Sequence, residues 1–146
     1  AAFDARTQFT DLALLARAAE WMASEPRCAR HAFNVVNGDQ PRWSELWPRF
    51  AAWFGLVPGM PRALTLTEHM RDKGPVWERI VARHGLRPTR LDTLVLWPYG
   101  DYQFRPQWDV VSSMEKARLF GFHETVDSQA MFVRQFGHYR TARIIP

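Results

Sequence analysis

The chain has 146 residues, 47% of them hydrophobic, and it contains seven Trp and ten Phe. It is long enough to bury the core of one domain, residues 1–146, and too hydrophobic to be a disordered chain. The formal net charge of +4 raises the question of nucleic acid. However, 17 of the 19 basic residues are arginines scattered along the chain, so we expect no nucleic-acid partner.

Two helices and one strand are predicted in the first part of the chain. Asp11 can cap a helix that ends before Pro26 and carries Leu15, Ala18, Ala19 and Met22 on one face. Residues 32–36 form a short β-prone run closed by Asn37-Gly38, which we interpret as one strand of a larger sheet. A second helix is predicted over 44–54, with Gly55 as its stop and with Leu46, Trp47, Phe50, Trp53 and Phe54 towards the core.

Five more helices are predicted in the remainder. Thr65 to Glu68 reads as a capping box that opens a short helix, and Pro75 begins another that runs to His84 and stops at Gly85. A helix over 89–96 gives way to an aromatic, irregular stretch at 99–108. A second capping box at 112–115 opens a helix that ends at Gly121, and the last helix begins near Asp127. The fold class is therefore mainly α with two or three short β-strands.

Several kinds of catalytic motif are absent from the sequence. There is no Gly-rich phosphate loop, no Gly-x-Ser-x-Gly and no Tyr-x-x-x-Lys, because the spacing from Tyr139 ends at Arg143. The histidines lack the paired spacing of a zinc site. We therefore predict no catalytic, cofactor-binding or metal-ligating residue within the chain.

Other sequence features indicate the protein's environment. Cys28 is the single cysteine and has no activating motif, so we expect an inert small side chain in a cytoplasmic protein. No apolar run reaches the roughly 18 residues of a membrane-spanning helix, so no membrane partner is expected. Ala1 in place of Met suggests a processed or truncated chain.

Blocks along the chain resemble one known enzyme family, in the same order. They lie at 10–21, 25–39, 43–48, 75–86 and 112–127, and the tail ends Arg143-Ile144-Ile145-Pro146. Together they are similar to the C-terminal part of an extended or atypical short-chain dehydrogenase/reductase of the NAD-dependent epimerase/dehydratase-like kind. The resemblance is to the subgroup of progesterone 5β-reductase, iridoid synthase and their bacterial relatives.

The resemblance implies that two parts of a longer protein have different functions. A preceding Rossmann domain would carry NADP(H) or NAD(H) and the catalytic Tyr and Lys, whereas this chain would be a substrate-side lobe without catalysis of its own. Its strand at 33–36 would pair into the sheet of that domain. Members of the named type reduce the activated C=C bonds of enones, so an enone or another carbonyl compound is the expected small-molecule substrate.

The resemblance also implies substrate-binding residues. The family's Phe-Ala-Asp motif, whose Phe lines the substrate pocket, matches Tyr99-Gly100-Asp101 here. The Tyr adds a hydroxyl to an apolar wall, which argues against a purely steroid-like or terpenoid substrate. We predict that Trp97, Tyr102 and Phe104 line the same cleft as Tyr99.

Two alternatives stay open at this point. The chain could be a stand-alone helical binding or interaction module without enzymatic activity, or a basic nucleic-acid-binding domain with steeply salt-dependent affinity. Aromatic side chains exposed by loss of the Rossmann domain would form a hydrophobic patch that favours a homodimer.

Overall fold

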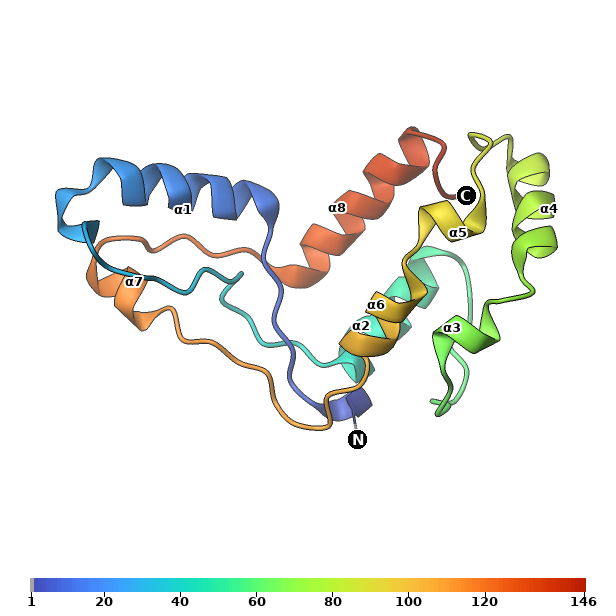
Figure 1. The fold of residues 1–146 in the computed structure, drawn as a ribbon, viewed down its shortest axis with the longest axis horizontal. Coiled ribbons are helices and arrows are strands. Elements are labelled where there is room, and N and C mark those ends of the chain that lie inside the picture. The colour runs from blue at the N-terminus through green and yellow to red at the C-terminus, as the bar shows by residue number, and fades with distance from the viewer. Residues whose placement is uncertain (1) are drawn as a thin grey trace.

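The computed structural model describes residues 2–146 and is mostly helical over that range. Its α-helices are α1 (Leu12–Ser24), α2 (Trp43–Trp53), α3 (Leu66–His69), α4 (Gly74–His84), α5 (Leu91–Leu94), α6 (Trp97–Gln103), α7 (Glu115–Leu119) and α8 (Ser128–Thr141). Two short 3-10 helices, η1 (Ala2–Asp4) and η2 (Pro26–Cys28), complete the set. The molecule is elongated: α1 and α7 lie at one end, α3, α4 and α5 at the other, and α2, α6 and α8 between them (Figure 1).

The predicted strands are wrong for the described part of the chain. Residues 2–146 contain no strand, only two isolated bridges, which join Arg6 to Arg42 and Gly38 to Val126. Residues 32–36 belong to no helix or strand, and side chains bond to their backbone. The Thr10 hydroxyl donates to the Val35 carbonyl at 2.9 Å, and the Val36 N–H donates to Met114 Sδ at 3.3 Å. A strand needs a second backbone, and here that backbone is missing.

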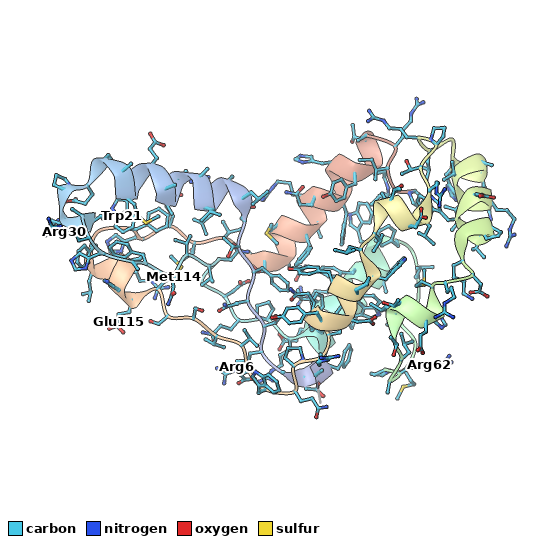
Figure 2. The ribbon with its side chains drawn as sticks, viewed as in Figure 1. Arg6, Trp21, Arg30, Arg62, Met114 and Glu115 are labelled. Carbon is cyan, nitrogen blue, oxygen red and sulfur yellow. The ribbon has the colours of Figure 1, made fainter. Side chains whose placement is uncertain are left out.

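The best-buried apolar core lies beneath α1. It comprises Leu14, Ala18, Val36, Met114, Ala117 and Phe122, with Trp21 and Met22 packed against it. The ring of Trp21 lies 5.0 Å from that of Phe33 and 5.2 Å from that of Phe122, between α1 and the segments beside it (Figure 2). The predicted face of α1 is thus only partly right, because Leu15 is 40% exposed while Leu14 is fully buried.

A second cluster, of aromatic rings, joins α2 to α8. The ring of Phe50 lies 5.0 Å from that of Phe132 and 5.1 Å from that of Phe136, in edge-on geometries that aromatic pairs favour. The guanidinium of Arg140 covers Trp53 at 3.8 Å from its ring centre. The prediction that Trp47 also belongs to the core is wrong, since that residue is 48% exposed.

Helices with strong local signals begin and end where the sequence predicts. The Asp11 carboxylate caps α1, and that of Asp127 caps α8. Gly85 ends α4 in the left-handed conformation (φ 60°), which glycine adopts with little strain. By contrast, the helix predicted over 89–96 shrinks to α5, and the irregular stretch expected from 99 contains most of α6.

The starts of α1 and α8 meet at a buried polar network around Asn37. Its side-chain oxygen accepts the Asp11 N–H at 2.7 Å, and its amide nitrogen donates to Ser128 Oγ at 3.0 Å. The Ser128 hydroxyl in turn donates to Asp39 at 2.6 Å. Asn37 and Ser128 are both fully buried, and no buried side-chain N or O atom in residues 2–146 lacks a partner. The network therefore fixes the start of α1 against the start of α8.

Asp11 holds a charge inside this network. Burial on its own would raise the pKa of the Asp11 carboxyl, but hydrogen bonds from the N–H groups of Leu14 and Ala13 act against it. The guanidinium of Arg134, which pairs with Asp11, adds to them, and the net effect is a lowered pKa. The carboxyl group is therefore an ionised structural cap and not a proton donor.

Candidate functional site

The residues predicted to bind substrate lie on and just after α6, whose position depends on a contact with α3. The Asp101 carboxylate accepts hydrogen bonds from the Leu66 N–H at 2.5 Å, the Thr67 N–H at 3.1 Å and the Thr67 hydroxyl at 2.6 Å. A Cβ on Gly100 would come within 2.9 Å of Leu66 Cδ1, so α6 approaches α3 closely at this point. Gly100 and Asp101 thus face α3.

The Asp101 carboxylate also replaces the predicted capping box. Thr65 precedes α3, but its side chain makes no cap hydrogen bond. The Thr67 hydroxyl is the main cause that lowers the pKa of Asp101; burial opposes it, and the N–H groups of Thr67 and Leu66 act with the hydroxyl. Asp101 is therefore an ionised tether between two helices.

We expect Asp101→Ala to lower the midpoint of thermal unfolding of the chain by about 2–5 °C, because the first turn of α3 loses its only side-chain acceptor in residues 2–146. The matched control is Thr65→Ala, which should leave the midpoint unchanged because that hydroxyl caps nothing. Thermal circular dichroism measures both. Equal shifts for the two variants would contradict the assignment of Asp101 as the cap of α3.

Tyr99 and Tyr102 project from α6 into open space. They are 58% and 66% exposed, and their ring centres lie 6.3 Å apart with the planes tilted by 30°. Within residues 2–146 neither phenol hydroxyl makes a hydrogen bond to another protein group. Both hydroxyls are therefore available to a ligand, as donors or as acceptors.

The structure does not bring all four predicted residues together. Trp97 lines a groove between α4 and α5, which Tyr99, Tyr102 and Phe104 do not line. The Phe104 ring packs edge-on against Trp43, with ring centres 4.8 Å apart, and stays 40% exposed. Of the four predicted residues, only Tyr99 and Tyr102 lie together as a pair. The sequence gives no signal for the groove, because its walls come from separate helices.

Three further features of residues 2–146 concern other kinds of site. Cys28 is buried, and burial raises the pKa of its thiol, which suits an inert side chain. No group of three or more His, Cys, Asp or Glu within residues 2–146 could hold a metal ion. None of the helices in this range has the length and apolar character needed to cross a bilayer.

Comparison with known proteins places the chain in a family. A family model described as a PRISE-like Rossmann-fold domain matches residues 9–146. The chain belongs to the PRISE-like Rossmann-fold family. This result confirms the resemblance to short-chain dehydrogenases/reductases of the iridoid synthase type seen in the sequence.

Similar proteins come from plants and a fungus. An (S)-8-oxocitronellyl enol synthase of Camptotheca acuminata is 34% identical over 141 residues, which cover 93% of this chain and 36% of that protein. A second enol synthase of the same name, from Nepeta racemosa, is 33% identical over 150 residues, covering 99% and 37%. A short chain dehydrogenase of Penicillium aethiopicum is 33% identical over 148 residues, covering 91% and 39%. The chain thus spans less than two fifths of these relatives, and the match is to a part of a PRISE-like protein.

Proposed function

We propose that this chain is the substrate-side lobe of an NADP(H)-dependent reductase that acts on the activated C=C bonds of enones. The match of residues 9–146 to the PRISE-like family carries the proposal. The names of the relatives, which include enol synthases and a short chain dehydrogenase, support the reductase chemistry.

The residues of this chain do not fit a nicotinamide dinucleotide. Such a cofactor binds where a strand runs through a Gly-rich turn into a helix N-terminus. The sequence has no such Gly-rich motif, and residues 2–146 contain no strand. Cofactor and catalytic residues are therefore assigned to another part of the protein, and no chemical step is assigned to this chain.

The contribution of this lobe is to bind and orient the substrate. Tyr99 and Tyr102 offer aromatic faces for an apolar skeleton, and their unpaired hydroxyls can donate to an oxygen on the substrate. Asp101 holds α6 in place and so fixes the direction of both rings. A hydroxyl where the family motif has Phe favours a substrate that carries a polar group as well as an apolar body.

The test is an NADPH-oxidation assay with a panel of enones and aldehydes. It compares this chain with a version extended through the upstream reading frame. We expect turnover and NADPH binding in the extended protein alone. Absence of both from the extended protein would contradict the proposal and favour the non-enzymatic interaction module.

In the extended protein, Tyr99→Ala and Tyr102→Ala should each raise KM about tenfold, the effect expected for an aromatic anchor at a binding surface. Tyr139→Ala is the matched control, because Tyr139 is the remaining tyrosine of the chain and lies on α8, 46% exposed. Steady-state kinetics measure all three variants. An unchanged KM in both α6 variants would remove Tyr99 and Tyr102 from the binding surface while leaving the reductase activity itself untouched.

A further inference from the structure

One face of α4 borders a groove instead of a packed core. Its residues follow helical spacing: Gly74, Trp77, Glu78, Val81 and Ala82. No residue of α4 is buried, and the groove has a volume of about 680 Å³. The facing wall is formed by Met70, Arg71, Pro88, Thr89, Arg90, Leu91, Asp92 and Trp97. This volume lies within the range of small-molecule sites.

The walls of the groove are held in place by specific contacts. The Trp77 indole N–H donates to the Thr89 carbonyl at 2.7 Å, which fixes the ring at the wall. The Arg87 N–H donates to the Arg143 carbonyl at 2.8 Å and ties the segment between α4 and α5 to the end of α8. Figure 1 shows α4 standing beside α5 at one end of the molecule. The groove is thus a formed feature with two tryptophans in its lining.

Charge around the groove favours an anion. Arg90 is neutralised by Asp92 at 2.5 Å, but Arg71 takes part in no ion pair within residues 2–146. Glu78 is the other carboxylate of the lining besides Asp92, and its negative charge repels an anion. The lining side chains alone therefore carry no net charge, but the segment 69–92 holds six basic residues against three acidic ones, so its surplus of three positive charges lies just outside the lining. Such a field raises the local concentration of anions.

We propose that this groove binds a small, flat, apolar molecule carrying one anionic group. The apolar body lies against Trp77, Val81 and Trp97, and the Arg71 guanidinium donates to the carboxylate or sulfonate at the rim. The site is distinct from the Tyr99–Tyr102 pair proposed above, which takes no part in its lining; of the four residues predicted to bind substrate, Trp97 alone lines the groove.

A matched pair of fluorescent probes tests the proposal on the whole chain. Anilinonaphthalenesulfonate and phenylnaphthylamine share one ring system, but only the first carries a sulfonate. We expect the sulfonate to bind about tenfold more tightly, as one charge-assisted contact predicts. Equal affinities for the two probes would overturn the assignment of an anion-selective groove.

Variants then locate the bound probe. Arg71→Gln should reduce the affinity for the sulfonate probe to that for the neutral probe. Glu78→Gln removes the opposing carboxylate, so it should raise the affinity for the sulfonate probe. Arg79→Gln is the control for the general field, since it removes the same charge from the same segment but Arg79 does not line the groove, so its loss of affinity should be the smaller one. Val81→Asn should weaken both probes, with an unchanged circular dichroism spectrum as evidence of folding. Equal losses of affinity for the sulfonate probe in Arg71→Gln and Arg79→Gln would overturn the proposal. Unchanged affinity of a folded Val81→Asn variant for both probes would also overturn it.

Discussion

Asn37→Ala is expected to lower the free energy of unfolding of the chain by about 2–4 kcal/mol. The substitution leaves the Asp11 N–H without its acceptor and the Ser128 hydroxyl without its donor, in a site with no exposure to water. It also leaves a small cavity where the starts of α1 and α8 meet. Urea unfolding followed by tryptophan fluorescence measures the change.

The matched control for this prediction is the chain's other asparagine. Asn34 lies three residues earlier and is exposed, and its amide donates to the Ser113 carbonyl at 3.2 Å. Asn34→Ala should therefore change the free energy of unfolding by no more than about 0.5 kcal/mol. Similar losses for the two alanine variants would show that burial of Asn37 does not govern its contribution.

The helices that the sequence predicts well are those with local signals. Asp11, Gly85 and Asp127 act within one helical turn of their own position, so their effects are visible without a tertiary structure. The Asn37-Gly38 pair shows the limit of such signals. Gly38 does adopt a positive φ of 103°, as a turn residue would, but the burial of the Asn37 side chain depends on residues 26 and 91 positions away.

The elements that sequence reasoning missed depend on distant contacts. The first turn of α3 is satisfied by Asp101, more than thirty residues further along, so the Thr65 pattern predicted the helix but not its cap. Residues 32–36 carry β-branched and aromatic side chains, yet without a partner backbone they form no strand and bond to side chains. Tyr99 is predicted through the family resemblance alone and stays a prediction, whereas the α4 groove requires three separate helices to be placed in space.

Leu14→Ala is expected to lower the free energy of unfolding by about 2–5 kcal/mol, since Leu14 is fully buried in the core under α1. Two other leucines on the same helix provide graded controls. Leu15 is 40% exposed, so Leu15→Ala should lower the free energy of unfolding by about 1 kcal/mol. Leu12 is 78% exposed, so Leu12→Ala should lower it by no more than about 0.5 kcal/mol. Chemical denaturation of all three variants decides between two orientations of α1. A larger loss at position 15 than at position 14 would mean that the helix buries the face predicted from the apolar spacing instead of the face seen in the structure.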